Sequence, residues 1–89
     1  MGFFSSLFSA ALIPTIANFE TKLSDRERFN FGREEFERSL KQITKAIRAT
    51  ESQSKKREAI KRLERLCEHR SLEPDERRML ENQVDDLFR

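Results

Sequence analysis

The first nineteen residues contain no charged side chain, although 38% of the whole chain is charged. Apolar residues in this segment recur at the spacing of one helix face, with serines mainly between them, which predicts a short helix over residues 3–13. Pro14 lacks a backbone donor and disfavours helical geometry at the preceding residue, so we expect a break or kink near Ile13. This segment constrains the fold most, because so much apolar surface has to be buried somewhere.

Four fates of the segment can be compared. A transmembrane helix needs about 20 predominantly apolar residues, and this run is barely that long and includes Pro14 and several polar residues. A secretory signal needs a basic start, and no base precedes Lys22. An interfacial membrane anchor fits better, as does packing against protein, either within this chain or on another copy. We expect the membrane or oligomer contact to be made by Phe3, Phe4, Leu7, Phe8 and Leu12.

Length and composition bound the rest of the chain. Its 89 residues make one small domain at most. Few glycines and prolines, together with many charged helix formers, predict an all-α fold. We divide the chain into the apolar segment 1–20 and a charged helical domain, 21–89. Cys67 is the only cysteine, so a reducing compartment is the default and we expect a cytoplasmic protein, peripheral to a membrane if the apolar segment meets lipid.

Two signals mark the start and the interruption of the charged helices. Ser24 followed by Glu27 matches a capping box and predicts a helix that begins immediately after Ser24. At 100° per residue, the apolar stripe within 36–47 lies about 180° from the stripe within 59–67. A break at 50–54 is the simpler interpretation of this change of face. The alternative is one continuous rod of about 35 residues, which would need oligomerisation to bury both stripes.

The C-terminal part of the chain predicts an antiparallel helical hairpin over residues 54–89. Pro74 suits the first position of a helix, and Asp75 and Glu76 favour the positive end of its dipole. The first helix of the hairpin has an excess of bases and the second an excess of acids, which suits an antiparallel pair or a head-to-tail contact between subunits. We expect the helix–helix interfaces to contain Phe36, Leu40, Ile43, Ile47, Leu63, Leu80, Val84 and Leu87.

No residue pattern points to catalysis or to a cofactor. Cys67 and His69 are two positions apart, so on a helix they do not face one another as a nucleophilic pair or a metal clasp. Acids and bases alternate at helix-pair spacing, as at Glu34 and Arg38, which is typical of a solvated face. The chain has no glycine-rich phosphate loop and no zinc-ligand spacing. We expect a protein that is not an enzyme and that binds no cofactor or metal.

Two groups of bases are candidates for contact with an anion such as a nucleic acid. Arginines surround two phenylalanines within residues 26–33, a pattern that could stack bases. A basic helix can also follow a row of phosphates, although Glu58 and Glu64 share this helix and weaken its field. The bases of this second group are Lys55, Lys56, Arg57, Lys61 and Arg62.

These observations favour a small, non-enzymatic helical assembly protein. Its apolar stripes would mediate self-association, and residues 1–20 would bury in an oligomer core or a membrane surface. One alternative is a small inhibitor or adaptor that docks on a larger protein partner. A nucleic-acid-binding regulator that uses residues 55–65 is the other, less favoured alternative.

Overall fold

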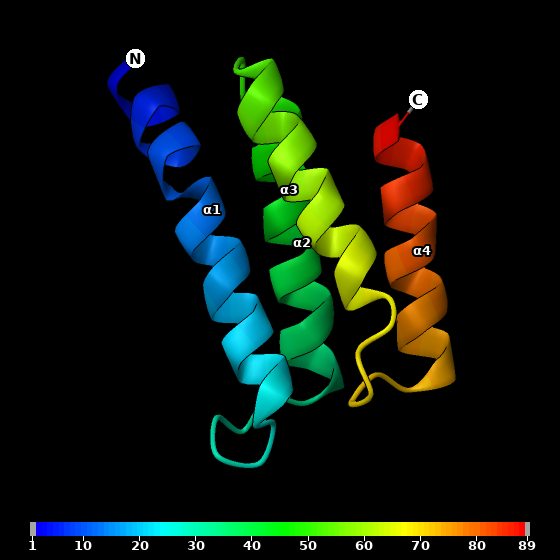
Figure 1. Cartoon of the computed structure of the whole chain (residues 1–89). Coiled ribbons are helices and arrows are strands. Elements are labelled where there is room, and N and C mark those ends of the chain that lie inside the picture. The colour runs from blue at the N-terminus through cyan, green and yellow to red at the C-terminus, as the bar shows by residue number, and fades with distance from the viewer. Residues whose placement is uncertain (1, 89) are drawn as a thin grey trace.

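The computed structural model describes residues 2–88, and it describes side chains for residues 12–88. The chain is all-α, as the composition predicts, and the described residues contain no strand. The four helices are α1 (Gly2–Ser24), α2 (Arg33–Ala49), α3 (Gln53–Leu66) and α4 (Pro74–Phe88). Successive helices run in opposite directions and are joined by short connections, so the chain forms an up-and-down bundle (Figure 1).

The bundle is flattened because its two central helices separate the outer ones. α2 and α3 pack on each other, and both α1 and α4 pack on this central pair. α1 and α4 lie on opposite sides of the pair and make no direct contact among the described residues (Figure 1). The Cα atoms accordingly extend 37 × 28 × 17 Å.

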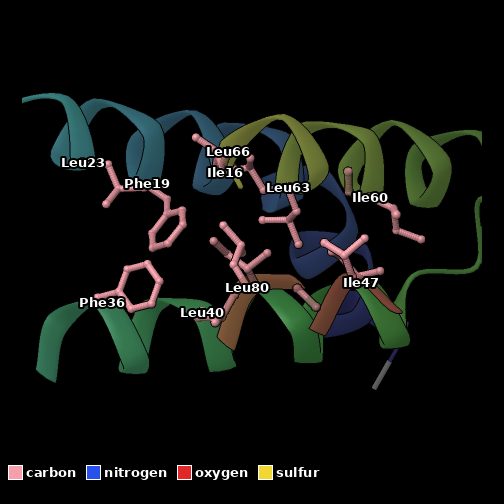
Figure 2. Packing of buried hydrophobic residues seen from close by; sticks show 14 of the residues in the cluster. Ile16, Phe19, Leu23, Phe36, Leu40, Ile47, Ile60, Leu63, Leu66 and Leu80 are labelled. Carbon is pink, nitrogen blue, oxygen red and sulfur yellow. The ribbon is translucent and has the colours of Figure 1, made fainter. Parts of the chain in front are cut away.

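A single hydrophobic core runs between the helices. α1 contributes one side chain per turn at spacings of four, three and four residues, which is the period of one helix face. Figure 2 shows Phe19 of α1 and Phe36 of α2 pointing toward one another, and their ring centroids are 5.5 Å apart. The core residues of the four helices are Leu12, Ile16, Phe19, Leu23, Phe36, Leu40, Ile43, Ala46, Ile47, Ala59, Ile60, Leu63, Leu66, Leu80 and Val84.

The predicted break near Ile13 is wrong, because α1 runs through Pro14 without interruption. Leu12 and Ile16 are both buried, on either side of the proline, whereas Pro14 itself is exposed. Packing on both sides therefore holds the helix together. A proline on the solvent side also leaves the missing helical hydrogen bond next to water, where its cost is lower.

The capping box predicted at Ser24 and Glu27 does not form either. Ser24 belongs to the last turn of α1, where its hydroxyl donates to the Glu20 carbonyl oxygen at 2.9 Å. Residues 25–30 form a turn instead of a helix. The turn brings Phe31 into the core, edge-on to Phe19 at a centroid distance of 5.7 Å. Burial of this aromatic ring, worth about 1.5–3 kcal/mol, outweighs the local capping preference.

The predicted break at 50–54 is confirmed, and the continuous rod is wrong. α2 ends at Ala49, and α3 begins after Ser52, whose hydroxyl oxygen accepts a hydrogen bond from the Lys55 backbone N–H at 3.4 Å. The change of direction lets the stripes of α2 and α3 face the same core, which a straight helix could not do. The hairpin is also confirmed, because α3 packs against α4, which starts at Pro74.

Ile16→Ala should destabilise the chain by about 2–5 kcal/mol, because Ile16 is fully buried between α1 and the central pair and its truncation leaves a cavity. Urea denaturation followed by circular dichroism measures the change. The exposed neighbour Asn18 provides the control, and Asn18→Ala should shift the unfolding free energy by less than about 0.5 kcal/mol. Equal effects of the two substitutions would mean that α1 does not pack on the bundle.

Candidate interaction surfaces

The most extensively bonded polar cluster joins the α1–α2 turn to the start of α4. The Glu76 carboxylate is 1% exposed and accepts two hydrogen bonds from the Arg26 guanidinium, Nη1 to Oε1 at 2.7 Å and Nη2 to Oε2 at 2.9 Å. Arg33 donates a third hydrogen bond from Nε to Oε2 at 3.2 Å. We call these three residues the Glu76 clamp. It is a buried anion with two-pronged recognition, the geometry in which an arginine–carboxylate pair is strongest.

Local chain geometry positions each member of the clamp. Glu76 is the third residue of α4, and its Oε1 accepts a hydrogen bond from the Glu73 backbone N–H at 3.1 Å, as in the second half of a capping box. Arg26 is fixed on the other side, because its Nε donates to the Phe31 carbonyl at 2.9 Å and its Nη1 to the Ser71 carbonyl at 3.1 Å. The turn after α1 and the loop before α4 are therefore joined through one side chain.

The clamp supports structure and offers no acid–base chemistry. The hydrogen bond from Arg26 lowers the pKa of the Glu76 carboxyl from 4.5 to about 2, although burial acts in the opposite direction. The carboxylate is thus ionised at neutral pH, and both of its oxygens already accept hydrogen bonds. Arg26 and Arg33 belong to the arginine–phenylalanine group that the sequence suggested for nucleic-acid contact, and both bind Glu76 within the chain. The Arg26 guanidinium also lies over the Phe31 ring, 5.8 Å from its centroid.

Cys67 and His69 lie at the end of α3 and in the loop after it, and each has a local partner. The Cys67 thiol donates to the Leu63 carbonyl oxygen at 3.6 Å, and burial raises its pKa. His69 Nδ1 accepts from the Ser71 backbone N–H at 3.1 Å. No group of three or more His, Cys, Asp or Glu side chains in the described part of the chain is arranged to hold a metal ion.

The predicted contact residues of the N-terminal segment divide into two sets. Phe3, Phe4, Leu7 and Phe8 belong to α1, but their side chains lie outside the described ones. Leu12 is 1% exposed and packs in the chain's own core, not on an external surface, because it shares the helix face of Ile16. Among the described residues, no helix combines the length and hydropathy that crossing a membrane requires.

The predicted interface residues lie between helices of one chain. Leu87 is partly buried against the core, and the others are buried within it: Phe36, Leu40, Ile43, Ile47, Leu63, Leu80 and Val84. The apolar stripes are therefore used inside the monomer.

The predicted basic helix does not present one continuous basic face. Arg62 turns toward α1 and pairs with Glu20, with Nη1 and Oε1 3.5 Å apart. Lys56 is half-buried, whereas Lys55, Arg57 and Lys61 are exposed. The exposed acids Glu58 and Glu64 also lie on α3.

A groove between α2 and α4 carries a second row of bases that the sequence analysis missed. Its volume is about 500 Å³, and Leu40, Thr44 and Met79 contribute to its lining. Four bases of α2 line it at spacings of three, four and three residues, which places them along one side of the helix. We call this surface, with Arg38, Lys41, Lys45 and Arg48, the basic groove.

A shallower crease between α3 and α4 has the opposite charge. Its volume is about 260 Å³, and its apolar lining is Cys67, Val84 and Phe88. We call it the acidic crease, because the remaining lining residues are Glu64, Glu81 and Asp85.

Sequence signals for these features differ in strength. The basic row could have been found, because its spacing is helical and local. The position of Glu76 two residues after Pro74 indicates a capping role, but nothing in the sequence pairs it with Arg26, which is 50 residues away.

Neither a scan of protein-family models nor searches of curated proteins and solved structures found a match to this chain.

Glu76→Gln should destabilise the chain by about 3 kcal/mol, because it leaves the Arg26 guanidinium without its buried counter-charge. This loss of stability is at the lower end of the range for breaking a buried ion pair, since the Arg26 side chain is 22% exposed. Chemical denaturation measures it, with Asp86→Asn on the exposed side of α4 as the matched control. If both variants unfold at the same urea concentration, the clamp does not stabilise the fold.

The contribution of Glu76 to stability should depend on pH in one direction. Its pKa is about 2 in the folded chain against an ordinary 4.5, so folding favours the ionised carboxylate. The contribution is complete above about pH 4.5 and is lost as the pH falls toward 2. Denaturation at several pH values should show the wild type and Glu76→Gln converging by about 3 kcal/mol over this range. A constant difference would show that folding does not lower the pKa of this carboxyl.

Proposed function

We propose that this chain is a non-enzymatic helical assembly protein that binds through the N-terminal part of α1. Residues 1–11, which we call the head, would bury in the core of a homo-oligomer or in a membrane surface. One observation carries the proposal. A single helix, α1, combines an uncharged first part with a second part that packs in the core through Leu12, Ile16, Phe19 and Leu23.

This continuity lowers the free-energy cost of using the head. Starting a helix is unfavourable, whereas adding residues to an existing one is close to neutral. Residues 12–24 supply the existing helix because the core holds them. Full burial of Phe3, Phe4, Leu7 and Phe8 would contribute about 1.5–3 kcal/mol each. A partner surface that buries them therefore gains most of this energy without paying for helix nucleation.

The burial of the apolar stripes limits which surfaces are left for association. The stripes predicted for self-association are buried inside the monomer, so association would use other surfaces. Among the described residues, the large apolar side chains left exposed are Phe29 and Phe88. The head is the longest uncharged run at the start of the sequence, and its side chains lie outside the described ones.

An adaptor role would use the same head on a larger protein, and no contact in the structure favours it over a second copy. Nucleic-acid binding through residues 55–65 is not favoured either, because Arg62 pairs with Glu20.

Phe4→Glu combined with Phe8→Glu should abolish head-dependent association, because a buried charge is costly to desolvate. Light scattering of the full chain should show the variant as a monomer where the wild type is larger, and flotation with vesicles should be lost if the head binds lipid. Circular dichroism should remain helical, since residues 12–24 are held by the core.

The matched control places the same two charges on the exposed part of the same helix, as Ala17→Glu combined with Asn18→Glu. This variant should associate as the wild type does. A wild-type chain that stays monomeric at high concentration and does not float with vesicles would overturn the proposal.

A further inference from the structure

The basic groove is lined by four bases and one acid. Arg38 pairs with Glu35 on its own helix at 3.3 Å. Lys41, Lys45 and Arg48 make no ion pair within the described part of the chain, and Glu37 is the only acid that lines the groove. Unbalanced charge of one sign along a groove attracts a partner of the opposite sign.

The residues that line the groove indicate which side chains a partner would need. Leu40 and Met79 provide apolar surface between the two helices, and Gln83 adds an uncharged polar group on the α4 side. The row from Arg38 to Arg48 extends about 15 Å along α2 at 1.5 Å per residue. The groove therefore fits an acidic helix surface that carries an apolar side chain.

The same chain presents such a surface at the acidic crease. Glu64 and Glu81 face each other across it from α3 and α4, and Phe88 at its edge is 63% exposed. Burial is the largest cause of the raised pKa of the Cys67 thiol, and the charges of Glu81 and Glu64 raise it further, while Arg77 acts in the opposite direction. The crease thus combines an exposed aromatic ring with carboxylates, which is the complement of the groove.

The two surfaces cannot meet within one molecule. Met79 and Gln83 lie on the side of α4 that faces α2, whereas Glu81 and Phe88 lie on the side that faces α3. α3 lies in front of α2 (Figure 1), and α4 packs on both, so the crease and the groove are lined by different sides of α4. A contact between them has to join two copies.

We propose that the basic groove is the docking site for the acidic crease of a second copy of this chain, with Phe88 placed over the Leu40–Met79 floor. This inference rests on the proposed assembly function and names the partner and the surfaces. The contact is heterologous, because the two surfaces lie on different sides of α4 and one copy does not turn both toward the same partner, so it produces stacks or rings instead of a closed two-fold dimer. Charge attraction makes it weaker at high salt.

Reversing charge on each surface tests the pairing in the full chain. The groove variant is Lys41→Glu with Lys45→Glu, and the crease variant is Glu64→Lys with Glu81→Lys. All four residues are exposed, so both variants should fold, which circular dichroism checks. Each variant alone should associate at least about tenfold more weakly than the wild type in light scattering across a concentration series. An equimolar mixture should regain wild-type mass, because each altered surface then complements the other.

Two controls separate this contact from general charge effects and from the head. Arg57→Glu with Lys61→Glu changes the same charges at the same spacing on α3, outside the groove, and should leave the mass unchanged. Phe88→Ala should weaken association without altering charge. If the wild type associates but neither variant differs from it, or if the mixture does not recover, the pairing is wrong while the head-driven function stands. A monomeric wild type overturns the pairing, and it overturns the assembly function as well if vesicles also fail to bind the chain.

Discussion

The buried carboxylate of Glu76 is the interaction on which the arrangement of the helices depends. α1 and α4 do not touch among the described residues, so the two outer helices are related through the central pair, through this clamp and through the Ser71 hydroxyl, which donates to the Leu23 carbonyl oxygen of α1. Arg26 and Arg33 come from the connection between α1 and α2 and the first residue of α2, while Glu76 begins α4. An ion buried this far is stable only when its partners are fixed, so the clamp also specifies which loop lies beside which.

The features that could be predicted from the sequence are those whose signals lie within a few residues. The break before α3 follows from the change of apolar face, and the start of α4 follows from Pro74 and the acids after it. The clamp could not be predicted, because Arg26 and Glu76 are 50 residues apart and each has a plausible local role. The capping box expected at Ser24 does not form, because the burial of Phe31 against Phe19 requires a turn in place of a helix start.

The N-terminal segment illustrates the same competition between local and tertiary effects. Pro14 is a local signal for a break, yet the side chains on either side of it lie in one continuous core, and the helix persists. The sequence predicted that this apolar segment needs a surface to pack on, either a membrane, another copy or the chain itself, and from Leu12 onward that surface is the chain itself. In a small domain with so much surface charge, most apolar residues are buried in one core, and few are left to form an external interface.

The clamp lies at the end of the bundle that holds the α1–α2 and α3–α4 connections, whereas both chain termini lie at the other end (Figure 1). Tension applied at the N-terminus is therefore transmitted along the axis of α1. Leu12, Ile16, Phe19 and Leu23 meet it in turn, one helical turn after another, before any of it reaches Arg26. A pulling force on the first helix therefore acts on its core contacts before it acts on the ion pair between Arg26 and Glu76.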